Sequence, residues 1–292
     1  MILQTPRSNA PRPRKHLRRW LRLRELKSIT GEMYMAATDT TQFKPPSKLL
    51  MLAEIRALGE LALGVAALPT IAATVNKGDG HTVLVLPGFL TSDRSTDFLR
   101  GVLRGLGLNA VGWEMGRNLG GIYGMREKLR EKVSDLARES GRKVSIVGWS
   151  LGGVYARDLA HAMPHAIRGI ISMGSPFSGD LRANNVGRLY DIVSGEKVDD
   201  ADPEDIRKLA GDMPVPATSI YSRTDGIVHW RTSLMNEHET AENIEVKGAS
   251  HLGLGFNPAV LWAVADRLSQ AEGAFARFTR NGPFAMAYGK AA

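Results

Sequence analysis

Hydrophobic and polar positions fall into blocks that predict strands separated by helices. From residue 82 onward, short runs rich in Val, Ile and Leu lack polar alternation, which is typical of strands covered on both faces. Helical stretches separate these runs near residues 94–106, 121–139, 150–162 and 257–270. This alternation predicts an α/β fold, with a mostly parallel central sheet and helices on both faces. We expect strands at Thr82–Leu86, Asn109–Trp113, Val144–Gly148, Ile167–Met173, Ala217–Tyr221 and Ile244–Val246.

The segment before this pattern, residues 48–76, is apolar and helical in character. Its Leu/Ala-rich run 48–67 is expected to end at Pro69, and it is too short and too charged for a good transmembrane helix. Glu54 and Arg56 stand two positions apart and would point to nearly opposite sides of a helix. A membrane-buried helix would have to bury one of them. We therefore expect a helix packed against the body of the protein or the mouth of its site, with a membrane-surface helix as the alternative.

The remaining regions divide the chain into a tail and one large domain. Residues 1–47 comprise a basic tail and a linker at 36–47, which we expect to be disordered in part. Residues 77–292 form the α/β domain. One longer polar insertion, 178–215, interrupts the alternation and contains an acidic cluster at 199–205. We interpret this insertion as a small helical cap.

The net charge of the 292-residue chain, +8, comes from the tail. Residues 1–30 carry nine Lys or Arg and one acid, so the rest of the chain is formally neutral. A solvated extension is the simplest interpretation, and translation from Met33 or Met35 would remove the segment. The second interpretation is a weak contact with an anionic membrane surface, because Leu17, Trp20 and Leu21 alternate with arginines. We do not expect nucleic acid as a partner.

The N-terminal sequence bears on the expected cellular compartment. No apolar stretch of signal-peptide type follows its positive charges, so we expect a cytoplasmic protein, membrane-associated if the tail binds lipid. The chain contains no cysteine, which excludes disulfides, thiolate catalysis and cysteine-ligated metal sites.

The clearest chemical signal is Gly148-Trp149-Ser150-Leu151-Gly152. A buried apolar run precedes it and a helical stretch follows it, which is the strand–turn–helix context of the G-x-S-x-G nucleophile elbow. Glycines on either side of the serine let the strand and the helix approach closely around a strained turn. The helix N-terminus then adds positive potential and free backbone N–H groups. Ser150 is therefore the candidate nucleophile.

A serine nucleophile needs a base, and the base needs an acid to orient it. With this elbow the chain order is serine, acid, histidine. Asp225 lies in a turn after the apolar run 217–221, and His251 lies in a Gly-rich loop before the last helical stretch. We predict that they are the acid and the base.

Two backbone N–H groups should stabilise the oxyanion. One is that of Leu151, directly after the serine. The other comes from the loop after the first strand, where Phe89 is the first choice and Leu90 the alternative.

The segment 112–120 also contains polar residues of interest. Arg117 or Asn118 could lie at the mouth of the site, but we favour a structural role in which this segment positions a loop.

The sequence resembles the α/β-hydrolase superfamily, and within it a bacterial esterase/lipase-like branch. The resemblance spans roughly residues 80–270 and implies an eight-stranded, mostly parallel sheet and an ester-hydrolysing triad of Ser150, Asp225 and His251. One difference is Pro87-Gly88 in the oxyanion loop, where many lipases have His-Gly. The matching motifs are LPGF at 86–89, GWEMGRNLG at 112–120, GWSLGG at 148–153, GSPF at 174–177, YSRTDGIV at 221–228 and SHLGLGFNP at 250–258.

The predicted function is hydrolysis of carboxylic esters through an acyl-enzyme, with no cofactor. The substrate would be a small-molecule or lipid-like ester, since the segment 48–75 and the insertion 178–215 are placed to build an acyl pocket or lid. We expect no metal site, because the neighbours Glu237, His238 and Glu239 point apart. Two alternatives remain open. One is an acyltransferase with the same triad, and the other is a non-catalytic interaction protein tethered by its basic tail.

Overall fold

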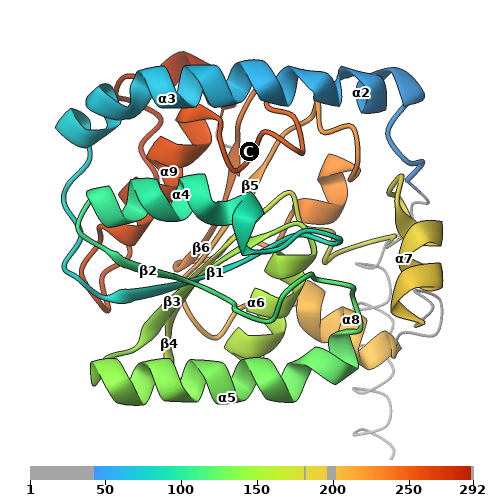
Figure 1. Cartoon of the computed structure of the whole chain (residues 1–292), viewed down its shortest axis with the longest axis horizontal. Helices are drawn as coiled ribbons and strands as arrows, with labels where there is room; N and C mark the ends of the chain where they lie inside the picture. The colour runs from blue at the N-terminus through green and yellow to red at the C-terminus, as the bar shows by residue number, and fades with distance from the viewer. Residues whose placement is uncertain (1–42, 181, 196–201, 291–292) are drawn as a thin grey trace, which may run out of the picture. The chain divides into compact units, whose positions relative to one another are not determined.

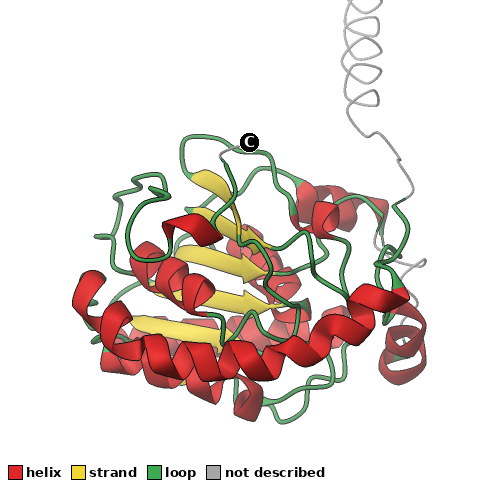
Figure 2. Cartoon of the chain, turned by 90° about the horizontal axis from the view of Figure 1, so that it is seen from above, coloured by secondary structure: helices red, strands yellow, loops and turns green. Residues whose placement is uncertain are grey.

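The computed structural model describes residues 43–180, 182–195 and 202–290, so the predictions made for residues 1–30 lie outside the described residues. Six strands form one sheet in the order β2-β1-β3-β4-β5-β6, and every neighbouring pair is parallel. Figure 2 shows the strands side by side with helices around them. The predicted parallel α/β fold is confirmed. The strands are β1 (Thr82–Leu86), β2 (Asn109–Gly112), β3 (Val144–Trp149), β4 (Ile167–Met173), β5 (Ala217–Tyr221) and β6 (Ala241–Glu245).

The sheet differs from the sequence-based expectation in two ways. The described residues form the six strands that the hydrophobic pattern indicated, where the resemblance implied eight. In addition, β6 begins three residues before the expected Ile244. Two of its first residues are polar but buried, so the sequence pattern did not mark them as part of a strand. Glu242 pairs with Arg267, and Asn243 exchanges hydrogen bonds with the backbone of Met235.

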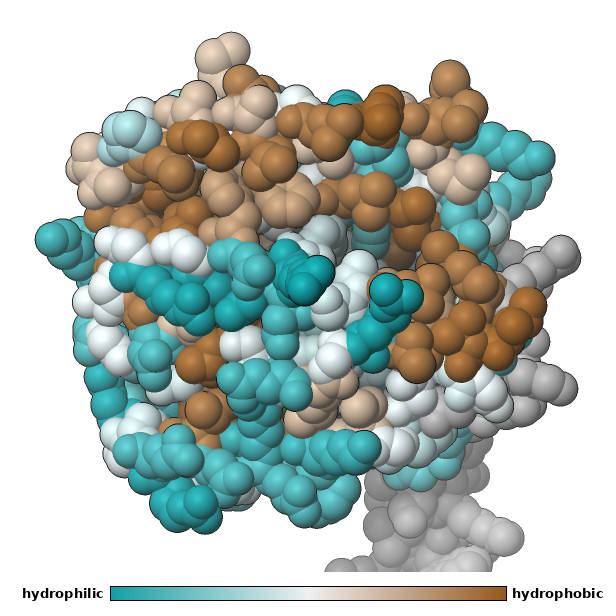
Figure 3. Space-filling model, viewed as in Figure 1, coloured by the Kyte–Doolittle hydropathy of each residue, from teal (hydrophilic) through white to brown (hydrophobic). Residues whose placement is uncertain are grey.

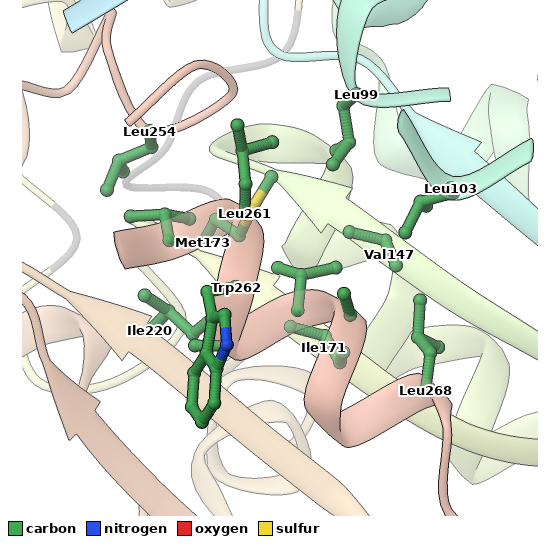
Figure 4. Close-up of a cluster of buried hydrophobic side chains, with 14 of the residues drawn as sticks. Leu99, Leu103, Val147, Ile171, Met173, Ile220, Leu254, Leu261, Trp262 and Leu268 are labelled. Atoms are coloured by element: carbon green, nitrogen blue, oxygen red, sulfur yellow. The ribbon is translucent and has the colours of Figure 1, made fainter. Parts of the chain in front are cut away.

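Helices cover both faces of the sheet (Figure 1). On one face, α4 (Asp93–Gly105) and α9 (Pro258–Leu268) bury one hydrophobic core, which Figure 4 shows from Leu99 across to Trp262. On the other face, α5 (Ile122–Ser140) and α6 (Leu151–Ala162) bury a second core. The strands are thus largely buried between two layers of helices, as their mainly apolar sequences predicted.

An N-terminal run of helices, α2 (Lys48–Leu52), the 3-10 turn η1 (Ala53–Arg56) and α3 (Ala57–Thr74), lies over the first face and packs on α9. The expectation that this helix ends at Pro69 is wrong, because α3 continues to Thr74. Proline removes the hydrogen bond to the carbonyl of Val65. Both residues lie on the exposed side of α3, so that carbonyl is not trapped in the core. Among the described residues, no helix is long and apolar enough to cross a membrane.

The insertion between β4 and β5 carries two short helices, α7 (Gly187–Ser194) and α8 (Pro203–Ala210). The side chain of Asp202 caps α8 by accepting the N–H of Glu204. The acidic residues at 199 and 200 lie outside the described residues. Two further 3-10 turns, η3 (Trp230–Ser233) and η4 (Ala285–Ala287), complete the described elements.

The strand order fixes where a ligand would bind. After β1 the chain turns to one side of the sheet to form β2, and it then returns to form β3 on the other side of β1. The carboxyl ends of β1 and β3 therefore mark the topological switch point, where open α/β sheets bind ligands. Ser150 follows β3 directly at this point, and Gly88 follows β1 closely.

Candidate active site

Ser150 occupies a strained turn between β3 and α6. Its backbone has φ of +54° and ψ of −121°, a conformation that costs free energy for a residue with a side chain. The turn is anchored because the N–H of Ser150 donates to the carbonyl of Met173 over 2.8 Å. The serine is partly exposed, whereas the strand before it is buried. The predicted elbow geometry is present.

The two glycines of the motif are required by close backbone approach. A Cβ on Gly148 would lie 2.3 Å from the carbonyl oxygen of Gly152, and a Cβ on Gly152 would lie 2.4 Å from that of Leu86. Real Cβ atoms do not approach backbone oxygens so closely. The sequence spacing therefore reflects packing of α6 directly against β3 and β1.

Gly152→Ala should destabilise the protein by about 3 kcal/mol, because the buried backbone of β1 and α6 would have to separate. Gly124→Ala is a matched control: it also lies in a helix, and nothing lies within 4 Å of the added methyl group. The control should gain about 0.5–1 kcal/mol. Urea unfolding of both variants measures the difference, and equal stabilities would contradict the described packing.

Asp225 and His251 are brought together from different loops. Asp225 follows β5, His251 follows β6, and His251 Nδ1 lies 2.7 Å from Asp225 Oδ2. The other carboxylate oxygen, Oδ1, accepts the N–H groups of Ile227 and Val228 over 2.8 and 2.7 Å. Both side chains are buried. Asp225 is thus fixed in orientation and holds one nitrogen of the imidazole.

This pair lies beside the serine turn. A Cβ on Gly174, which directly follows β4, would lie 3.1 Å from both Asp225 Oδ2 and His251 Nδ1. The residue before it, Met173, accepts the N–H of Ser150. From the other side, the indole N–H of Trp149 donates to the carbonyl of His251 over 3.1 Å. The three predicted residues therefore gather around the ends of β3, β4, β5 and β6.

The charge state of His251 is set by opposing effects. Burial lowers the pKa of the imidazole, whereas the Asp225 carboxylate, by charge and by hydrogen bond, and the Glu54 carboxylate raise it. The net result is a pKa above the ordinary value for histidine.

If His251 is the predicted base, it must be neutral to accept a proton, so activity should rise with pH as His251 loses its proton. We expect the acidic limb of kcat/KM for a soluble ester to have its midpoint above pH ~6.5, the ordinary histidine pKa. A pH series of initial rates measures this midpoint. A midpoint clearly below that value would contradict the environment described for His251.

The oxyanion loop distinguishes between the two candidate donors. The N–H of Leu90 donates to the carbonyl of Asn118 over 2.7 Å, so it is not free to stabilise an oxyanion. This leaves Phe89 as the candidate from this loop. Leu151 is the first residue of α6, where a backbone N–H has no acceptor within the helix. The loop also packs closely on the nucleophile, since a Cβ added to Gly88 would lie 3.3 Å from the Cβ of Ser150.

Asn118 has the loop-positioning role that we favoured for its segment. It is fully buried, its amide N–H donates to the carbonyl of Pro87 over 2.9 Å, and its backbone N–H donates to the carbonyl of Thr91 over 2.7 Å. Its side-chain oxygen accepts the hydroxyl of Tyr155 over 3.2 Å. Asn118 thus ties both ends of the oxyanion loop to α6.

The sequence did not reveal a second carboxylate at the site, Glu54 of η1. Its Oε1 accepts the N–H groups of Gly226 and His251 over 2.7 and 3.0 Å, and its Oε2 accepts the N–H of Leu252 over 2.8 Å. Glu54 is 4% exposed. One buried carboxylate therefore joins the turn after Asp225 to the loop that carries His251.

Two residues near Glu54, Arg56 and Glu60, also bind these two loops. Glu60 accepts the N–H of Ser250 over 2.9 Å, and Arg56 donates to the carbonyls of Thr224 and Ala249 over 2.5 and 3.1 Å. The expectation that Glu54 and Arg56 point to opposite sides is wrong. The tighter 3-10 turn at 53–56 changes their angular spacing, and both side chains reach the same loops.

Comparison with solved structures supports the architecture. The fold is similar to that of lipase B from Aspergillus fumigatus, with a TM-score of 0.52 and 20% identity over 68% of this chain and 55% of that chain. It is also similar to the propeptide form of the lipase BlEst2 from Bacillus licheniformis, with a TM-score of 0.51 and 17% identity over 70% of this chain and 54% of that chain. No protein-family model and no curated protein matches the sequence.

These likenesses, together with the all-parallel sheet, establish that the chain has the α/β-hydrolase fold. At such identities they establish the fold alone. The chain spans just over half the length of the A. fumigatus lipase B chain. Its own chemistry must therefore be argued from its own residues.

Proposed function

We propose that the protein hydrolyses carboxylic esters through an acyl-enzyme formed on Ser150. The observation that carries the proposal is the buried Asp225–His251 hydrogen bond beside the strained serine turn at the switch point of the sheet. Both similar structures are lipases by name, which agrees with this reaction class.

In the first half of the reaction, Asp225 holds the Nδ1–H of His251, which leaves Nε2 as the proton acceptor. His251 takes the proton of the Ser150 hydroxyl while the serine oxygen attacks the ester carbonyl. The N–H groups of Phe89 and Leu151 stabilise the resulting oxyanion. His251 then gives its proton to the departing alcohol, and the acyl group stays on Ser150.

In the second half, His251 takes a proton from water, and the hydroxide attacks the acyl-enzyme carbonyl. Collapse of this second tetrahedral intermediate releases the carboxylic acid and returns the proton to Ser150. Throughout, the carboxylate of Asp225 stabilises the imidazolium without becoming protonated.

Aromatic and apolar groups lie next to the candidate oxyanion donor Phe89. The ring of Phe89 lies 5.3 Å from the ring of Tyr190 on α7, and Gly120 packs on that same tyrosine. Leu119, which precedes Gly120 in the chain, is exposed. These groups favour a lipid-like ester, with an apolar acyl chain, over a charged one.

A series of p-nitrophenyl esters from acetate to palmitate tests the proposal on the purified protein. We expect turnover that depends on Ser150, with the highest kcat/KM on an acyl group longer than acetyl. If the folded protein turned over no ester faster than its Ser150→Ala variant, the proposed reaction would be wrong. A maximum on acetate would retain the reaction and overturn the apolar acyl preference.

A further inference from the structure

The helix run α2–η1–α3 lacks the charged outer side of an ordinary surface helix. Its two acids, Glu54 and Glu60, are buried and face the catalytic loops. No exposed position from Leu49 to Ala73 carries a charged side chain. A helix on a water-exposed surface normally shows charged and polar residues outside and apolar residues inside.

The outward side carries large apolar groups, and we call it the α2–α3 face. Figure 3 shows hydrophobic residues gathered along the top of the view, over α2 and α3. An open, mainly apolar groove of about 560 Å³ between α3 and α4 continues this surface and is lined in part by Leu68, Phe98 and Val102. Seven large side chains of the face are 38–77% exposed: Leu49, Met51, Leu52, Ile55, Leu58, Leu63 and Val65.

A contiguous apolar surface of this kind marks a binding surface. The charge around it indicates the partner. Exposed lysines stand just outside both ends of the face, Lys44 and Lys48 at one end and Lys77 at the other. Residues 1–30, which precede it in the sequence, carry the whole net charge of the chain. Apolar groups flanked by basic groups match a bilayer that contains anionic lipid.

We propose that the α2–α3 face docks the protein on an anionic lipid bilayer, lying in the plane of the membrane surface. The helix run stays attached to the body, because leaving it would strip Glu54 and Glu60 from the backbone N–H groups that they satisfy.

Docking at this face would hold the candidate active site close to the lipid. The N–H of Leu252 is bonded to Glu54, and the Leu252 side chain, directly after His251, is 47% exposed. An apolar ester could then pass from the bilayer to the serine without crossing bulk water. The lipid docking itself does not depend on the proposed reaction.

Flotation of the full chain with vesicles tests the proposal. We expect co-flotation with phosphatidylglycerol/phosphatidylcholine vesicles and at least about ten-fold weaker partitioning onto phosphatidylcholine alone. Leu52→Ser together with Ile55→Ser should weaken partitioning onto the mixed vesicles at least about ten-fold. The matched control is Leu189→Ser with Ile192→Ser, which removes one exposed leucine and one exposed isoleucine from α7 instead.

Thermal unfolding of both double variants checks that they are folded, and the measurement requires no turnover. Equal weakening by both pairs, or vesicle binding that survives Leu52→Ser/Ile55→Ser, would overturn the proposal. It would also be overturned if the protein did not bind vesicles and instead formed a dimer that Leu52→Ser/Ile55→Ser dissociates. The face would then bind a second copy of the chain.

Discussion

Replacing Ser150 by alanine should lower kcat/KM for a p-nitrophenyl ester by a factor of about 10⁴ or more, because alanine lacks the hydroxyl on which the proposed acyl-enzyme forms. Alanine removes only the hydroxyl and keeps the backbone of the elbow, so the thermal stability should change little. Initial rates at saturating and limiting ester concentrations, on protein purified in parallel, measure the loss.

The control for this variant is Ser140→Ala. Ser140 ends α5, where its hydroxyl bonds only to the nearby backbone. We expect its kcat/KM to match that of the wild type. A Ser150→Ala protein that keeps more than about a tenth of the activity would remove the serine from the mechanism.

Replacing Glu54 by glutamine should be the second most damaging change. Glutamine has one acceptor oxygen in place of two, so one of the three backbone N–H groups bound by Glu54 would face an amide NH₂. A buried donor without an acceptor costs about 1–3 kcal/mol. We expect a loss of stability of this size and about a ten-fold or larger fall in kcat/KM, because His251 and the turn after Asp225 lose a common support.

The pH profile separates positioning from general destabilisation. The Glu54 carboxylate is one of the charges that raise the pKa of His251, so its removal should move the acidic limb of kcat/KM to lower pH. Glu60→Gln is the matched control: Glu60 also accepts an N–H of the histidine loop, but it is not among the charges that raise the pKa of His251.

The control should therefore lose stability while its acidic limb stays in place. If Glu54→Gln and Glu60→Gln moved the limb equally, or if neither moved it, Glu54 would have no specific electrostatic connection to His251. Urea unfolding and a pH series of initial rates on both variants supply the two readouts.

The sequence revealed the sheet well because its strands are buried on both faces. Five of the six strands were predicted within one residue, since each contains a short run rich in apolar residues between helical stretches. The sixth, β6, was placed too late because Glu242 and Asn243 are buried with polar partners. Local periodicity cannot distinguish such satisfied polar residues from a surface loop.

The candidate site was predictable where one short motif carries the information. The elbow at 148–152 is local, and the order of Ser150, Asp225 and His251 follows from the fold. Choosing Phe89 over Leu90 required knowing that the Leu90 N–H is bonded to Asn118, a contact outside any motif.

Glu54 was not predictable because its partners lie 172–198 residues away along the chain. In the sequence it is one acid within a Leu/Ala-rich run, and such an acid is normally solvated. The expectation of a helix packed against the body was correct, because α3 packs on α9 and Glu54 and Glu60 bind the loop that carries His251. The sequence did not show which side chains this helix would leave exposed.

The central claim is that Ser150 is the residue that becomes acylated. Its most direct test is to treat the full chain with a fluorophosphonate probe, digest it and map the modified residue by mass spectrometry. The account predicts one adduct, on the peptide that contains Ser150, and slower labelling when His251 is replaced by alanine. No adduct on the folded protein, or an adduct only on another residue, would contradict it.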